Sequence, residues 1–257
     1  MLQSSVPGLP QNTSQLFSPL SSKFPPEGNV DTLIERLLSN GDLIPAETLW
    51  KVEMESVVQA PTPESKNAFV TNPINFRTTD SFLVTRLELT GTFSIYFKLK
   101  TTKRDGLLMY AGPLMQDRQD FMALELVGGV IRFVFDVGTG IRVVRSNRKP
   151  EISDNEWHDV GVLRPTLTQQ ILRVDDSARA DPLPDEAGDY DLSDEFYVGG
   201  LPQHLYDQLP KQVKSRHGFH GCFGSIDLNG GSQNLIEDGR AIVMEGNIVS
   251  GCEGNRI

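Results

Sequence analysis

DFMALELVGGVIRFVFDVGTG, residues 120–140, reads as two strands joined by a tight turn. In the first half, alternate residues from Met122 to Leu126 are apolar and share one face, as in a half-buried strand. Gly128-Gly129 supplies the two-residue turn that antiparallel hairpins favour. Alternate residues from Ile131 to Phe135 are apolar again beyond it. This stretch therefore predicts a β-hairpin with one face in the core.

The same period of two continues on both sides of the hairpin. Upstream, alternate residues from Phe93 to Leu99 are apolar, and a turn at Arg104–Gly106 leads into another apolar strand. Further short strands separated by Gly and Asp turns are predicted at 156–164, 171–177, 195–202 and 221–231. No convincing long helix lies between them, so the pattern predicts an all-β, antiparallel two-sheet sandwich and not an α/β fold.

Residues 1–66 differ in composition from the rest, because Ser, Pro, Gln and Asn dominate and strand alternation is missing. One short helix is predicted at about 31–40, where Asp31 suits an N-cap and Asn40-Gly41 suits the end. We expect residues 1–66 to be a largely disordered leader or linker, and residues 67–257 to form one domain.

Charge and motifs exclude several classes of function. A formal charge of −10 argues against nucleic-acid binding, which needs a basic face. No apolar run approaches the length of a membrane span, and the start of the chain lacks the pattern of a signal peptide. The four histidines have no metal-ligand spacing, and the paired carboxylates of glycoside hydrolases on related sandwiches are missing. We therefore predict that the protein is not an enzyme.

Several landmarks together resemble a laminin G-like domain, also called an LNS domain, and most closely the central LNS domains of neurexins. They fall in the family's order: GTFSIYFKLK and its turn, the hairpin at 120–140, DNEWHDVGVLR, EFYVGGLP, HGCFGSIDLNG and VSGCEG. The resemblance covers about residues 70–253 and implies a jelly-roll sandwich.

The same resemblance implies an extracellular or cell-surface adhesion and recognition module that binds a protein or glycan ligand from the cell surface or matrix. In neurexins such a domain often precedes an EGF-like module. We therefore expect the chain to be part of a longer membrane-anchored protein, or an incomplete gene product.

The two cysteines, Cys222 and Cys252, allow two interpretations. Both could be buried free thiols, as in a cytosolic protein. The resemblance instead implies a disulfide, because laminin G-like domains join the cysteine of the Gly-Cys strand to one near the C-terminus of the domain.

The resemblance also implies a weak Ca²⁺ site at one rim of the sandwich. Its ligands would be the Asp120 and Asp191 carboxylates and the Val137 and Asp189 carbonyls. Ca²⁺ prefers oxygen and takes six to eight ligands, so water or a partner would complete the set, with affinity on the order of 10⁻⁴ to 10⁻³ M. The alternative is that DEAGDYDLSDE is only a solvated acidic loop.

A second functional hypothesis is glycan binding, of heparan sulfate or matriglycan type, by a matrix-protein module. The candidate residues are basic and lie in two segments: Arg142 and Arg145, and Lys211, Lys214 and Arg216. Such charges are more often ordinary solvated side chains. Given the net charge of −10, we expect appreciable heparin affinity only if the two segments converge in space.

Overall fold

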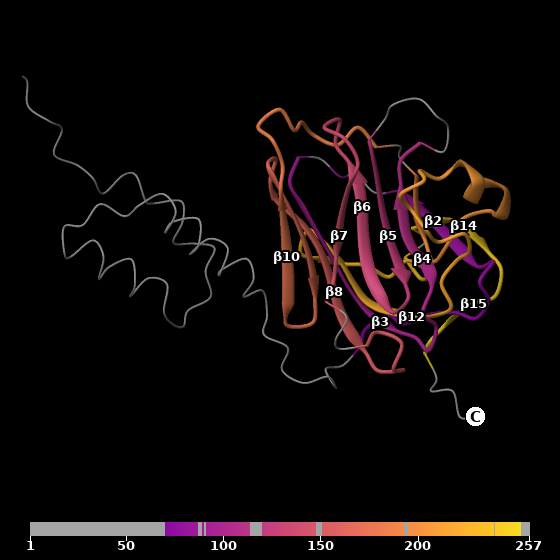
Figure 1. The fold of residues 1–257 in the computed structure, drawn as a ribbon. Helices are drawn as coiled ribbons and strands as arrows, with labels where there is room; N and C mark the ends of the chain where they lie inside the picture. The colour runs from indigo at the N-terminus through magenta and orange to yellow at the C-terminus, as the bar shows by residue number, and fades with distance from the viewer. Residues whose placement is uncertain are drawn as a thin grey trace, which may run out of the picture. The chain divides into compact units, whose positions relative to one another are not determined.

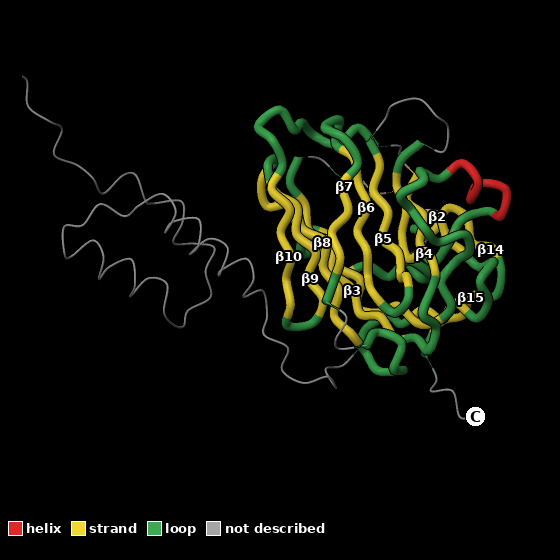
Figure 2. The backbone as a smooth tube through the Cα atoms, viewed as in Figure 1, coloured by secondary structure: helices red, strands yellow, loops and turns green. Residues whose placement is uncertain are grey.

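A computed structural model describes residues 70–86, 89, 91–113, 120–147, 151–192, 195–238 and 240–252. These residues form two antiparallel sheets that lie face to face (Figure 1), joined by loops and one short 3-10 helix (Figure 2). The predicted all-β jelly-roll sandwich is confirmed. The predicted leader, residues 1–66 with its helix at about 31–40, lies outside the described residues. No helix in the described ranges is long and apolar enough to cross a membrane.

The first sheet, sheet A, contains eight strands. Their order across the sheet is β10 (Ser177–Pro182), β9 (Gln169–Val174), β8 (His158–Thr166), β3 (Phe93–Lys100), β12 (Gly221–Leu228), β1 (Ile74–Phe76) and β15 (Ile248–Ser250). The short strand β13 (Gly231–Ser232) pairs with the end of β12. Strands that are distant in the sequence thus become neighbours, as β1 does when it lies between β12 and β15.

The second sheet, sheet B, contains seven strands. Their order is β14 (Ala241–Glu245), β2 (Phe82–Arg86), β11 (Glu195–Val198), β4 (Gly106–Ala111), β5 (Phe121–Val127), β6 (Val130–Asp136) and β7 (Arg142–Arg145). The helix η2 (Gln203–Gln208) lies in the segment between β11 and β12.

The predicted hairpin is confirmed as β5 and β6. Val127 pairs with Val130, and both turn residues, Gly128 and Gly129, have positive φ angles of 60° and 79°. Glycine adopts these angles without a steric penalty, which fits a two-residue hairpin turn. The alternate apolar residues of both strands face the space between the sheets, where they join the inward side chains of β3 in the main core.

Sheet B is also covered on its outer face, by the segment that contains η2. Tyr206 and Leu209 from this segment pack with outward residues of β4, β5 and β6, among them Tyr110 and Val134. The β4 and β5 strands are therefore buried on both faces. This second apolar layer fixes the segment between β11 and β12 to the sheet.

A buried carboxylate holds the end of the same segment. The Glu125 side chain is fully buried, and its Oε1 accepts a hydrogen bond from Arg132 Nη1 at 2.5 Å. Its Oε2 accepts the backbone N–H groups of Lys214 and Ser215 at 2.8 and 2.7 Å. Arg132 Nη2 donates in turn to the Gln212 carbonyl at 3.1 Å. Each carboxylate oxygen thus has a donor, which buried charge requires.

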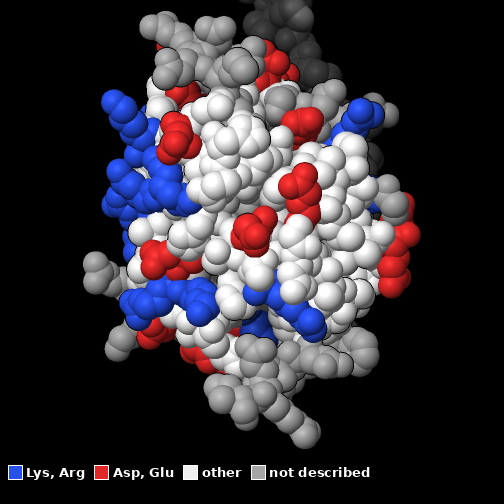
Figure 3. All heavy atoms as spheres, turned by 90° about the vertical axis from the view of Figure 1, so that its right-hand side faces the viewer, with Lys and Arg blue, Asp and Glu red and all other residues white. Residues whose placement is uncertain are grey.

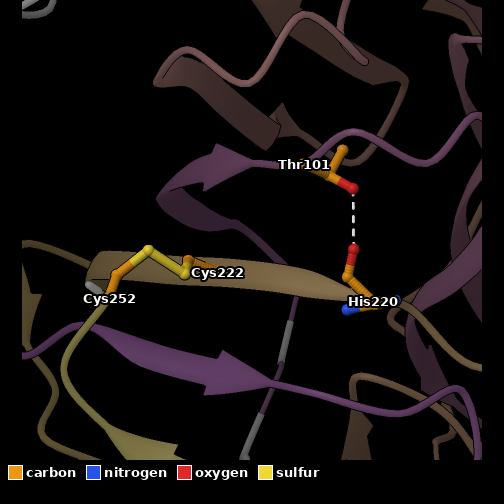
Figure 4. Close-up of a disulfide and its surroundings, with 4 residues drawn as sticks. All are labelled: Thr101, His220, Cys222 and Cys252. Atoms are coloured by element: carbon orange, nitrogen blue, oxygen red, sulfur yellow. Dashed lines mark hydrogen bonds between the residues drawn. A yellow bond between two sulfur atoms is a disulfide. The ribbon is translucent and has the colours of Figure 1, made fainter. Parts of the chain in front are cut away.

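The predicted disulfide between Cys222 and Cys252 is present, with Cα atoms 6.0 Å apart (Figure 4). Cys222 lies in β12, and Cys252 follows β15 at the other end of a 30-residue interval. Near the start of β12, Thr101 Oγ1 donates a hydrogen bond to the His220 carbonyl at 2.7 Å. The interpretation with two free thiols is therefore wrong.

Candidate functional site

The β5–β6 hairpin brings together two of the four residues predicted to bind Ca²⁺. Phe121 pairs with Asp136 in the antiparallel register, so Asp120 and Val137 are the next residues outward on the two strands. Asp120 immediately precedes β5, and the Val137–Gly140 turn immediately follows β6. A Cβ atom on Gly138 would lie 3.9 Å from Asp120 Oδ1, so the carboxylate lies beside the turn.

The loop before β11 brings the third residue to the same place. The Asp191 backbone N–H donates a hydrogen bond to Asp120 Oδ2 at 3.0 Å. Asp120, the Val137–Gly138 turn and Asp191 therefore meet at one rim of the sandwich, although Asp120 and Asp191 are 71 residues apart.

Asp189 is placed differently from Asp120 and Asp191. Its carboxylate oxygen Oδ1 occupies space beside Gly91 that a Cβ atom there would fill. The side chain is thus directed toward the start of β3. This orientation fits the predicted use of the Asp189 carbonyl, and not its carboxylate, as a ligand.

The charge around Asp120 suits a cation. Burial raises the pKa of Asp120, the N–H donated by Asp191 lowers it, the carboxylates of Asp136 and Asp191 raise it, and the Arg164 cation lowers it. A bound cation would relieve this penalty on the ionised carboxylate. The donors are carboxylates and carbonyls, which fits a hard ion such as Ca²⁺.

The donor set is sparse. Within the described ranges, no three His, Cys, Asp or Glu side chains gather as a metal-binding group. The predicted site would have two carboxylate ligands and would depend on backbone carbonyls and water for the rest. Thr139 in the same turn adds a buried hydroxyl oxygen without a hydrogen-bond partner among the described residues. Such a set fits weak Ca²⁺ binding.

Asp136 shapes the turn that carries the Val137 carbonyl, and the sequence analysis missed it. Its Oδ1 accepts the Gly140 N–H at 3.0 Å, while Gly138 and Gly140 adopt positive φ angles of 80° and 100°. The signal was available, because an Asp followed by glycines is typical of a side-chain-capped turn.

The predicted basic residues do not form one group. Arg142 lies at the edge where the sheets meet, and its Nη1 donates to the Pro182 carbonyl at 3.2 Å and lies 3.4 Å from Asp181 Oδ2. Arg145 is three residues further along β7 and is exposed. In the register of β6 and β7 it lies opposite Arg132, on the outer face of sheet B.

The second basic segment approaches Arg145 through Arg132, which bonds to the Gln212 carbonyl. Lys211, Lys214 and Arg216 are exposed in this segment. Arg216 Nη1 donates to the carbonyls of Val213 and Ser215, and Lys214 Nζ donates to the Lys211 carbonyl. Of the two arginines in β7, Arg145 is thus the one that lies opposite Arg132, whose side chain bonds to this segment. Viewed from the side of β14 and β15, Lys and Arg gather along one border of the molecule (Figure 3).

Comparisons with known proteins agree with this architecture. The sequence model of the Laminin G domain matches residues 99–231. Neurexin-2 of Mus musculus is 37% identical over 188 residues, which cover 73% of this chain and 11% of that protein. Neurexin-3a of Danio rerio is 34% identical over 218 residues, or 84% of this chain and 12% of that protein. The chain thus spans only a small part of these relatives.

Among solved structures, domains LG4-5 of the mouse laminin alpha1 chain superpose with a TM-score of 0.58 at 22% identity. The match covers 74% of this chain and 49% of that one. The fold, the disulfide and these likenesses agree. The chain therefore belongs to the laminin G domain family, as a laminin G-like (LNS) domain similar to those of neurexins.

Proposed function

We propose that this domain is an extracellular, non-catalytic recognition module that binds a protein or glycan partner at a Ca²⁺-bearing rim. The convergence of Asp120, the Val137–Gly138 turn and Asp191 carries the proposal. The likeness to neurexins supports the location and the general role.

In this proposal the Asp120 and Asp191 carboxylates and the Val137 and Asp189 carbonyls hold the ion. Bound Ca²⁺ supplies a hard cation with coordination positions left for water or for oxygens of a partner. The protein contributes the geometry, because the hairpin register places Asp120 beside Val137 and the Asp191 N–H ties the second loop to Asp120. The rim would then present a charged but ordered surface to its ligand.

Removal of the Asp120 carboxylate tests the site. At a Ca²⁺ concentration of about 10 to 100 times the dissociation constant, wild type should gain about 1.4 to 2.7 kcal/mol of unfolding free energy. For a domain of this size that gain corresponds to a rise in Tm of about 3–10 °C. Asp120→Ala should lose the rise, as measured by thermal melts in CaCl₂ and in EGTA.

Glu186→Ala is the matched control, because Glu186 is an exposed carboxylate in the same acidic loop and is not a predicted ligand. It should keep the wild-type response. A wild type that is not stabilised by millimolar Ca²⁺, or an Asp120→Ala variant that still responds, would refute the site.

A second candidate function, binding of a sulfated glycan, is favoured by the position of Arg145 opposite Arg132, which bonds to the Lys211–Arg216 segment at Gln212. If it is correct, wild type should be retained on heparin at physiological ionic strength. The double variant Arg145→Ala/Lys211→Ala should elute at clearly lower salt, because fewer cations contact sulfates.

The control for this experiment removes the same charge elsewhere, in Arg77→Ala/Arg240→Ala, where both side chains are exposed. It should elute close to wild type. Flow-through of the wild-type protein would instead favour a protein ligand.

A further inference from the structure

Arg164 of β8 is a buried cation close to the proposed Ca²⁺ rim. Its side chain is fully buried, at 0% exposed, in register with Phe93 of β3. Its Nη2 donates two hydrogen bonds to backbone carbonyls, to Leu167 at 2.9 Å and to Gly188 at 2.5 Å. Burial of a charge is costly unless the surroundings compensate, so such a residue is rarely incidental.

The same guanidinium lies against a ring of the rim loop. Its central carbon is 4.9 Å from the centroid of the buried Tyr190 ring. The Tyr190 hydroxyl accepts a hydrogen bond from Gln170 Nε2 at 3.2 Å, and its ring packs against Phe93 at 5.8 Å between centroids. A desolvated cation over an aromatic face is attracted to the ring. Arg164 thus contacts the loop at both Gly188 and Tyr190.

The segment Gly188–Asp191 is therefore held along its length. Arg164 binds it at Gly188 and Tyr190, and Asp120 binds it at the Asp191 N–H. Between these contacts lies Asp189, whose carbonyl is a predicted ligand. Arg164 Nε and Nη1 have no hydrogen-bond partner within the described ranges. The guanidinium thus contacts the Gly188 carbonyl and the Tyr190 ring of this loop, and the Leu167 carbonyl of the β8–β9 turn.

We infer that Arg164 is a positioning residue for the Ca²⁺ site, which holds the Gly188–Asp191 backbone where its oxygens meet Asp120. The inference rests on the proposed function. An arginine suits the task because it donates to two carbonyls while its planar face lies on the ring, whereas a lysine ammonium has donors but no planar face. The Arg164 guanidinium is itself a cation close to the proposed Ca²⁺ and would repel it. The inference therefore requires that holding the loop favours Ca²⁺ binding more than this repulsion opposes it.

Two substitutions separate positioning from charge. Arg164→Lys keeps the charge and loses the planar guanidinium, whereas Arg164→Met loses both. Both variants should bind Ca²⁺ at least about tenfold more weakly than wild type, as measured by isothermal titration calorimetry, which is the lower end of the effects found for groups that orient metal ligands. Wild-type affinity in Arg164→Lys together with tighter binding in Arg164→Met would show that the charge dominates, and would overturn the inference.

A second measurement needs no metal. In EGTA, the Asp191 amide should exchange its hydrogen at least about tenfold faster in Arg164→Lys than in wild type, because its loop is no longer held. Val174→Ala, a core variant at the other end of β9 from Gln170, is the control for general destabilisation. It should leave this exchange rate and the Ca²⁺ affinity unchanged.

If Val174→Ala accelerates exchange as much as Arg164→Lys, or if neither variant does, the inference fails. Tyr190→Leu, which removes the aromatic face, should resemble Arg164→Lys, and Tyr190→Phe should bind Ca²⁺ like wild type. If wild type binds no Ca²⁺, the proposed function fails instead. In that case the Asp191 amide should still exchange faster in Arg164→Lys than in wild type, which shows that the positioning role of Arg164 holds although the Ca²⁺ site does not.

Discussion

Glu125→Ala is expected to lower the free energy of unfolding by about 3–5 kcal/mol, as is typical when one partner of a buried ion pair is removed. The substitution leaves Arg132 as a buried cation without its carboxylate. It also removes the acceptor for the Lys214 and Ser215 N–H groups. Urea denaturation followed by circular dichroism measures the loss.

A surface ion pair provides the control. Arg104 and Glu151 also form a salt bridge, but both side chains are more than half exposed, at 59% and 52%. Glu151→Ala should therefore cost only about 0–1 kcal/mol. The double variant Glu125→Ala/Arg132→Met should recover part of the loss, since it removes the unpaired cation. A Glu125→Ala variant as stable as Glu151→Ala would contradict this role of the buried Glu125 carboxylate.

Loss of the disulfide is the second large effect. Closing a loop of 30 residues stabilises a fold by about 3.5 kcal/mol in the chain-entropy account, so Cys222→Ala/Cys252→Ala should lose about that amount. Reductant should destabilise wild type by a similar amount and leave the double variant unchanged. Paired urea titrations with and without dithiothreitol make the comparison.

Two results would count against this expectation. Equal stability of wild type with and without dithiothreitol, once thiol titration confirms reduction, would mean that the bond adds nothing. A dithiothreitol effect in the double variant would mean that the reductant acts elsewhere. Because Cys222 is only 5% exposed, the alanine variant also loses some packing. The comparison of wild type with and without dithiothreitol leaves the packing atoms in place and so measures the effect of the bond alone.

The inner faces of the strands could be predicted from the sequence because they follow a local rule. A period of two, interrupted by Gly128-Gly129, is enough to define the hairpin and its core face. The same register brings Asp120 beside Val137, so this half of the candidate site follows from the turn alone. Alternation along β7 likewise separates Arg142 from Arg145, since residues three apart point to opposite faces.

The outer layer could not be predicted in the same way. Tyr206 and Leu209 lie among polar residues in a segment without strand alternation, and their partners lie on strands far away in the sequence. The available signal was that β4 and β5 are apolar at nearly every position, which is typical of a sheet covered on both faces. The contacts of Asp191 and Arg164 depend on loop packing over long sequence distances, which no local period encodes.

The path of the chain through sheet A has a mechanical consequence. Strands β1 and β15 pair antiparallel, with Ile74 opposite Ser250, and the Gly251 N–H donates to the Pro73 carbonyl at 2.8 Å. The described chain thus enters and leaves at one corner, so tension on both ends would act on β15, a strand at the edge of the sheet. Cys252 instead transmits that force through a covalent bond to β12, which is flanked by β3 and β1 inside the sheet. The load would then be shared by the β1–β15 and β1–β12 ladders.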